Sequence, residues 1–210
     1  MGGMTTSLVT YHRTLHDPRI KAAVTLAGPG SMFSTEFYDH RPVPLLALHG
    51  DLDAIVDYEY NALRTIGRAA PYATLVTIAE GSHTAFAPIP LEELVLPLMG
   101  ELVAPEGSHP DNPDRLGCGM IADSMPDDAS FLDLMGGAEN GMTTADDPMP
   151  CDMAFLSQPA LEPDTQREIA AIATLAFLDA YLAGDQTRRE QACHFLEDGL
   201  PNMSGVSVSR

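Results

Sequence analysis

The chain has 210 residues, 45% of them hydrophobic, and its 11 basic against 30 acidic side chains give a formal net charge of -19 at pH 7. This length allows one domain with a sizeable core, and the negative charge argues against nucleic acid or anionic membrane surfaces as partners. No run of eighteen apolar residues predicts a membrane span, and residues 1–12 lack the basic start and long apolar core of a secretory signal.

The first half of the chain predicts alternating helices and strands. Residues 1–12 predict a helix that begins with two glycines, and residues 20–27 predict a strand that ends at a Gly-Pro-Gly turn. A second strand follows over residues 43–49, then a helix over residues 58–70 and a third strand over residues 73–79. This alternation is typical of a parallel α/β sheet with right-handed crossovers.

Two of these strands end in loops that carry titratable side chains. Strand 43–49 leads into an acidic turn that contains Asp53, and strand 73–79 leads into a Gly-Ser-His loop that contains His83. Neighbouring parallel strands end at one edge of the sheet, where open α/β sheets place their chemistry, so we expect the two side chains to meet. A carboxylate beside an imidazole fixes its tautomer and stabilises its charged form, which suits a general base.

Simpler interpretations of these residues exist. Asp is favoured in turns and helix caps whatever the function, and Asp51 and Asp57 are rivals for the role of the acid. His83 could be an ordinary loop histidine, and His49 is expected to orient its loop rather than to react. The remaining histidines are predicted at surface or helix-end positions: His12, His16, His40, His109 and His194.

Three short motifs resemble those of the α/β-hydrolase superfamily. His-Gly-Asp-Leu-Asp-Ala-Ile-Val at residues 49–56 is similar to its His-Gly-x-x-Asp-x-x-Val acid loop, and Gly-Ser-His at residues 81–83 is similar to its histidine loop. Met-Gly-Gly at residues 1–3 is similar to the end of the Gly-x-Ser-x-Gly nucleophile elbow in its Ser-Met-Gly-Gly form. The order of elbow, acid and histidine also agrees with the chain order of that fold.

The resemblance implies a serine ester hydrolase that needs no cofactor and acts on a small-molecule ester. It implies that Asp53 is the triad acid, His83 the general base and the backbone N–H of Met1 an oxyanion donor. The serine would stand immediately before Met1, and Ser7, about two turns along the following helix, cannot replace it. We therefore expect the C-terminal portion of such an enzyme, inactive without its nucleophile.

The composition changes after the first half. A helix is predicted over Leu91–Val103, and residues 105–163, the acidic segment, are then rich in Pro, Gly and acidic side chains. A segment this long predicts a cap, a binding loop or a disordered insertion. A disulfide between Cys118 and Cys151 would stabilise it by about 4 kcal/mol in the chain-entropy model. The compartment is otherwise undetermined, but this disulfide would favour a soluble secreted or periplasmic protein.

The aspartates of the acidic segment do not predict a metal site. They do not fit the Asp-x-Asp-x-Asp-Gly spacing of a calcium loop, and the histidines show no convincing metal-ligand spacing. A solvated acidic loop is the expected outcome. The aspartates concerned are Asp123, Asp127, Asp128, Asp133, Asp146, Asp147 and Asp152.

Regular structure is predicted again from residue 165. Thr-Gln-Arg-Glu at residues 165–168 matches a capping box, and apolar side chains then follow at helical spacing up to Gly184. Because this helix is apolar nearly all round, it is expected to be buried on more than one side. Its Leu-x-Gly-Asp ending resembles the last helix of the dienelactone hydrolase, chlorophyllase and platelet-activating-factor-acetylhydrolase-like branch. A short helix over residues 187–197 and a Gly/Ser-rich tail finish the chain.

The sequence thus predicts an α/β fold: the C-terminal part of an α/β-hydrolase sheet, with three parallel strands and flanking helices, an irregular acidic insertion and a returning C-terminal helix. The expected units are a partial core over residues 1–104, the insertion over residues 105–163, and C-terminal helices and tail over residues 164–210 that pack on the core. Strand 20–27 would be an exposed edge, through which the chain would self-associate.

Two alternatives to an esterase follow from the same features. A prolyl-oligopeptidase-type peptidase or a lactone hydrolase would carry the same acid and histidine loops. A non-catalytic pseudoenzyme or binding module would instead use the acidic segment.

Overall fold

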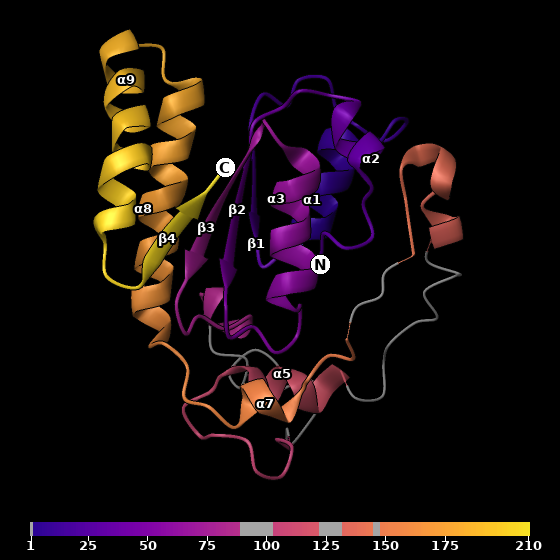
Figure 1. The fold of residues 1–210 in the computed structure, drawn as a ribbon, viewed down its shortest axis with the longest axis vertical. Coiled ribbons are helices and arrows are strands. Elements are labelled where there is room, and N and C mark those ends of the chain that lie inside the picture. Colours follow the sequence, from indigo (N-terminus) through magenta and orange to yellow (C-terminus); the bar gives the residue numbers. More distant parts are fainter. Residues whose placement is uncertain (1, 89–102, 122–131, 145–147) are drawn as a thin grey trace.

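A four-stranded mixed sheet forms the centre of the computed structural model, which describes residues 2–88, 103–121, 132–144 and 148–210 (Figure 1). The strands are β1 (Ala23–Leu26), β2 (Leu45–Gly50), β3 (Ala73–Ile78) and β4 (Val206–Ser209), in that spatial order. β1, β2 and β3 are parallel, and β4 runs antiparallel to β3. The α/β class is as expected, whereas the expectation of three parallel strands misses β4.

The two central strands are apolar because helices cover them on both sides. All residues of β2 and β3 are buried, as expected of strands inside a parallel sheet. Leu45 and Ala73 pack with α1 (Gly2–Tyr11), α2 (Thr35–Asp39) and α3 (Arg64–Ala69). Leu46, one residue further along β2, points to the opposite face.

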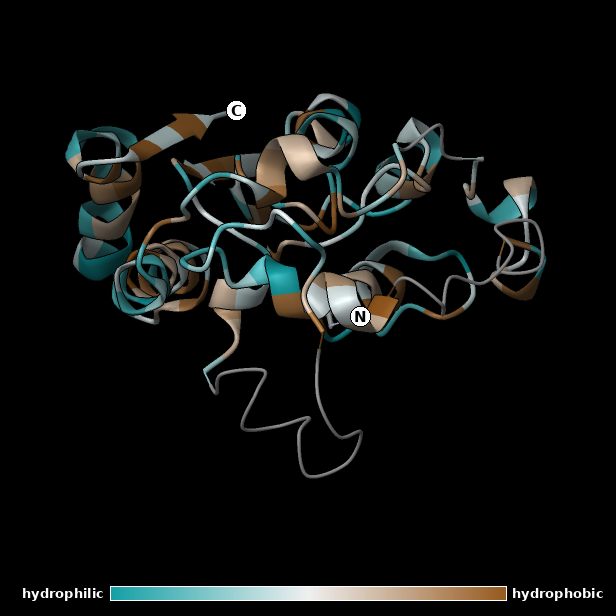
Figure 2. Ribbon diagram, turned by 90° about the horizontal axis from the view of Figure 1, so that it is seen from below, coloured by the Kyte–Doolittle hydropathy of each residue, from teal (hydrophilic) through white to brown (hydrophobic). Residues whose placement is uncertain are grey.

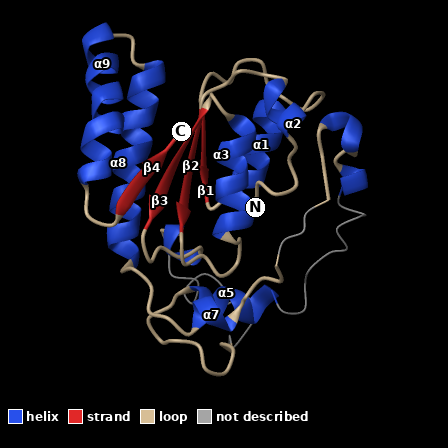
Figure 3. Ribbon diagram, viewed as in Figure 1, coloured by secondary structure: helices blue, strands red, loops and turns tan. Residues whose placement is uncertain are grey.

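On that opposite face, α8 (Pro163–Leu182) and α9 (Gln186–His194) cover the sheet (Figure 3). Phe177 of α8 is fully buried there in a cluster with Leu46 and Leu48. Figure 2 shows that α9 is mainly hydrophilic on its outer side. In the part of the chain that the structure describes, no helix combines the length and apolarity needed to cross a bilayer.

Several helix boundaries differ from those expected. The helix predicted over residues 58–70 begins as a π-helix, Tyr58–Leu63, before α3 continues it. The capping box at residue 165 is wrong, because α8 begins at Pro163 and its N-cap is Glu162, whose carboxylate accepts from Thr165 N–H at 2.9 Å. The helix expected over Leu91–Val103 lies, except for its last residue, outside the described residues.

Other short helical elements in the described residues are the π-helix Phe195–Gly199, which continues α9, and the 3-10 turns Thr84–Phe86, Ala138–Asn140 and Leu200–Asn202.

β4 occupies residues that read as a Gly/Ser-rich tail. Its valines are half-buried and alternate with exposed serines. Val206 and Val208 pack against the cluster under α8 and α9, so the alternation is that of a strand with one covered face. An alternation over four residues is too short to predict a strand within a Gly/Ser-rich composition.

The acidic segment is not irregular throughout. It contains α5 (Asp114–Ile121) and α7 (Met153–Leu156), which lie beyond the carboxyl ends of the parallel strands (Figure 1). The disulfide Cys118–Cys151 joins α5 to the turn before α7. A separate part, residues 132–144, packs beside α2, where Met142 forms a β-bridge with Phe33. The described parts of the segment are therefore docked on the core.

Candidate active site

Two loops at the carboxyl edge of the sheet lie in direct contact: the acid loop (residues 51–57) after β2 and the histidine loop (residues 79–84) after β3. A Cβ placed on Gly50 would lie 2.1 Å from the carbonyl oxygen of Gly81. That same oxygen accepts a hydrogen bond from Leu52 N–H at 3.0 Å. Only glycine permits so close an approach, so Gly50 helps to bring the loops together.

The acid and histidine loops bring Asp53 and His83 together, as their places in the sequence suggest. Nδ1 of His83 lies 3.0 Å from Oδ2 of Asp53. The Asp53 side chain is completely buried, whereas that of His83 is 25% exposed. Because a carboxylate can only accept, Nδ1 carries a proton, and in the neutral imidazole Nε2 is left as an acceptor. Within the described residues, Nε2 has no hydrogen-bond partner.

Asp53 is also tied to its own loop. Its Oδ1 accepts hydrogen bonds from Ile55 N–H at 2.9 Å and Val56 N–H at 2.7 Å. Nε2 of His49 lies 3.2 Å from Oδ2 and 2.8 Å from the Val56 carbonyl oxygen, both of them acceptors. His49 thus orients the acid loop. Asp53 both caps a turn and contacts His83. A capping carboxylate and a carboxylate that orients His83 are therefore not exclusive interpretations of this residue.

The electrostatics of this pair favour its ionised form. Burial raises the pKa of Asp53, but the charge of His83 and the hydrogen bonds from His49 and His83 outweigh burial and bring that pKa well below its usual value. Burial lowers the pKa of His83, but the charge and hydrogen bond of Asp53, together with the charge of Asp114, outweigh burial and raise it. An imidazole with a raised pKa and a free Nε2 is suited to accept a proton.

The two rival carboxylates accept hydrogen bonds from other backbone N–H groups. Asp51 accepts a hydrogen bond from Glu80 N–H at 2.7 Å and joins the acid loop to the histidine loop. Asp57 is the N-cap of the π-helix and accepts from Tyr60 N–H at 2.8 Å. Neither contacts His83, so Asp53 is the carboxylate that orients it.

A further buried carboxylate, Asp114 of α5, was not anticipated. Its Oδ2 accepts from Ala54 N–H and from His83 N–H, both at 3.0 Å, and its Oδ1 accepts from Thr84 N–H at 2.7 Å and Thr84 Oγ1 at 2.8 Å. Burial and the nearby charge of Asp53 raise the pKa of Asp114, although the backbone hydrogen bonds oppose this shift. No sequence signal marks this residue among the other aspartates of the segment.

His83 lines a pocket of about 660 Å³ together with Gly2 and Gly3 at the N-terminus of α1. Gly3 lies against the end of β1, since a Cβ on it would be 2.6 Å from Cα of Gly28. The first N–H groups of a helix have no partner within the helix and attract negative charge. Met1, expected to be an oxyanion donor, lies outside the described residues. Ser7 points back into the helix and donates to Gly3 C=O at 3.2 Å.

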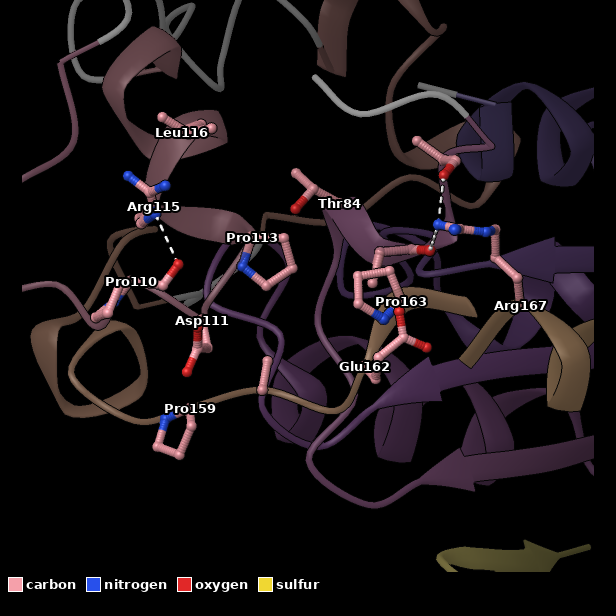
Figure 4. A pocket seen from close by; sticks show the side chains of 13 residues that line it. Thr84, Pro110, Asp111, Pro113, Arg115, Leu116, Pro159, Glu162, Pro163 and Arg167 are labelled. Atoms are coloured by element: carbon pink, nitrogen blue, oxygen red, sulfur yellow. Dashed lines mark hydrogen bonds between the residues drawn. The ribbon is translucent and has the colours of Figure 1, made fainter. Parts of the chain in front are cut away.

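A second cavity, of about 630 Å³, adjoins the histidine loop between the first turns of α5 and α8 (Figure 4). Arg115 donates from Nε to the Pro110 carbonyl oxygen at 3.1 Å. Arg167 donates to the carbonyl oxygens of Ala85 and Ala87 at 3.2 and 3.0 Å, which fixes the start of α8 to the chain after His83. The acidic segment and α8 thus shape the surroundings of the histidine loop.

His12 contacts the part of the acidic segment beside α2 rather than this site. His12 follows α1, as expected of a helix-end residue, but it is buried, and its Nε2 lies 2.9 Å from the Met135 carbonyl oxygen. In the described ranges, no group of three or more His, Cys, Asp or Glu side chains could hold a metal ion. Five of the aspartates considered for a metal site lie outside those ranges: Asp123, Asp127, Asp128, Asp146 and Asp147.

No protein-family model, no curated protein and no solved structure matches this chain.

Proposed function

We propose that this chain carries the acid and the base of a serine ester hydrolase of the α/β-hydrolase type. The observation that supports this most is the 3.0 Å contact between Asp53 and His83 at the carboxyl edge of a parallel sheet. The exposed part of His83 faces the same pocket as Gly2 and Gly3. The motif resemblance implies a nucleophilic serine directly before Met1, at the end of the chain that Gly2 and Gly3 continue.

Each residue then has a defined part in ester hydrolysis. The serine attacks the acyl carbonyl carbon, Nε2 of His83 takes the serine proton, and the same proton later passes to the leaving alcohol. Asp53 holds Nδ1–H and stabilises the imidazolium that forms. The N–H groups at the start of α1 face the oxygen on which negative charge develops. Water then repeats the sequence on the acyl-enzyme and releases the acid.

The first experiment reads the coding DNA upstream of Met1 and expresses the longer chain if an in-frame Gly-x-Ser precedes it. The longer protein is expected to hydrolyse a short-chain p-nitrophenyl ester. His83→Ala is expected to lower kcat by about 10⁶-fold, as loss of the histidine does in a well-studied triad. The matched control is His194→Ala, because the His194 side chain is 77% exposed; this variant should keep full activity.

Two results contradict the proposal. One is an upstream reading frame without the serine, and the other is a longer protein whose hydrolysis survives His83→Ala. A panel that adds a lactone and a prolyl peptide substrate separates the esterase from the lactone hydrolase and peptidase alternatives.

A further inference from the structure

We propose that Asp114 is a positioning residue of this site: its carboxylate sets the spacing between the backbone of the acid loop and that of the histidine loop, so that His83 stays against Asp53. The catalytic meaning of this role rests on the proposed function, but the geometry behind it does not.

One oxygen of Asp114 bridges the two loops. Its Oδ2 accepts from the N–H of Ala54, the residue after Asp53, and from the N–H of His83 itself, both at 3.0 Å. Oδ1 accepts two further hydrogen bonds from Thr84. The carboxylate therefore binds the backbone next to Asp53 and at His83. Its two oxygens accept four hydrogen bonds in all.

The backbone of Asp114 is itself held by a buried hydrogen-bond network. Asn112 accepts from Asp114 N–H at 3.0 Å, and its Nδ2 donates to the carbonyl oxygens of Phe155 and Gln158, each at 3.1 Å. Asn112 and Asp114 are both completely buried. These contacts connect the start of α5 to α7 and hold the backbone of Asp114 in place.

A second connection reaches the same point of the acid loop. The carbonyl oxygen of Ala54 accepts from Cys151 N–H at 2.6 Å, and Cys151 is disulfide-bonded to Cys118 of α5. Ala54 is thus held at both its N–H and its C=O by the acidic segment. This segment acts as a scaffold for the loops that carry Asp53 and His83.

An ionised side chain is needed for this arrangement. An asparagine offers one acceptor oxygen, and its amide N–H groups would face the N–H donors of the loops. A neutral substitute would therefore lose hydrogen bonds, and the acid and histidine loops would become more mobile. The negative charge also adds to that of Asp53 in favouring the protonated form of His83.

The test compares Asp114→Asn with Glu106→Gln, the same change of charge at an exposed position of the same segment. Hydrogen exchange is measured at the amides of Ala54, His83 and Thr84. The pKa of His83 is measured by NMR on histidine-labelled protein, with the His83→Asn spectrum to assign its signal. In Asp114→Asn, the three amides are expected to exchange roughly ten- to hundredfold faster, and the pKa of His83 is expected to fall. Glu106→Gln should change neither.

Unchanged exchange and an unchanged pKa of His83 in folded Asp114→Asn would overturn the proposal. If that variant does not fold, Thr84→Val replaces it, since it removes one of the four hydrogen bonds and keeps the carboxylate. Exchange at the amide of residue 84 is then expected to rise about five- to tenfold, and an unchanged rate would overturn the proposal.

These readouts require no turnover, so a longer protein without ester hydrolysis would contradict the proposed function and leave them unaffected. In an active longer protein, Asp114→Asn is expected to lower kcat about ten- to hundredfold with little change in KM. A folded Asp114→Asn enzyme with full kcat would overturn the positioning role and leave the hydrolase function standing.

Discussion

Gln166 and Ser82 exchange two hydrogen bonds across 84 residues of chain: Oε1 accepts from Ser82 N–H at 2.9 Å, and Nε2 donates to the Ser82 carbonyl oxygen at 2.7 Å. Both residues are buried. Ser82 immediately precedes His83, and Gln166 belongs to α8, so the histidine loop is held by α8 before the histidine and by Asp114 at and after it.

Removing the amide of Gln166 should destabilise the protein. Gln166→Leu leaves the N–H and C=O of Ser82 buried without partners, and we expect the free energy of unfolding to fall by about 2 to 4 kcal/mol. Urea denaturation measures this change. The control, Gln186→Leu, alters an exposed glutamine bonded to Glu190 and should cost less than about 0.5 kcal/mol. Equal losses in both variants would contradict the role of Gln166.

The ion pair of Asp53 and His83 should give a stability difference that depends on pH. Asp53 has a lowered pKa in the folded state, so its stabilisation is present above the unfolded value of about 3.9 and is lost as the pH falls through the folded value. His83 has a raised pKa, so its stabilisation is present below about 6.5 and is lost as the pH rises through the folded value.

Asp53→Asn removes both contributions. The free energy of unfolding of the variant is therefore expected to be lower than that of the unaltered chain. The difference is largest, about 3 kcal/mol, between about pH 4 and pH 6.5. The difference should narrow on either side of this window. Urea denaturation of both proteins across the pH range measures it, and a difference that stays constant with pH would argue against the ion pair.

The disulfide should be a main support of the acidic segment. Cys118 and Cys151 are 33 residues apart, and closing a loop of that size stabilises the folded state by about 4 kcal/mol in the chain-entropy model. Replacing both with Ser should lower the melting temperature and make it insensitive to reductant. Cys193→Ser should do neither, because Cys193 is exposed and unpaired. Equal melting temperatures for the double variant and the unaltered chain would rule this support out.

The β1 edge of the sheet should promote self-association. Among the described strands β1 pairs only with β2, and Leu26 on this edge is 40% exposed. Sedimentation velocity is expected to show concentration-dependent oligomers, which Leu26→Lys should shift towards the monomer. Leu15→Lys, at a residue that is 55% exposed but outside the sheet, should not. A monomer at every concentration would contradict this prediction.

The contact between Asp53 and His83 could be anticipated because it depends on local signals. Each residue follows directly after an apolar strand, and one topological rule places the ends of neighbouring parallel strands together. The α/β class follows from the same alternation of strands and helices. These inferences need no knowledge of which distant residues meet.

Asp114 and Gln166 could not be anticipated, because their roles depend on distant partners. Asp114 lies in a Pro-rich stretch where other aspartates look alike, and only the fold brings it beneath Ala54 and His83. Gln166 occupies the first turn of a helix, where a glutamine is unremarkable. The sequence favours Thr165 over Glu162 as N-cap because Thr-x-x-Glu has the spacing of a capping box.

Asp114 and Gln166, which hold the loops of the site, are synthesised after the two residues of the site. Asp53 and His83 leave the ribosome first, Asp114 follows 31 residues after His83, and Gln166 follows 84 residues after Ser82. Synthesis proceeds from the N-terminus, and distant contacts form late. A nascent chain therefore contains both Asp53 and His83 before Asp114 or Gln166 has been made. Residues that are synthesised later therefore complete the site that Asp53 and His83 begin.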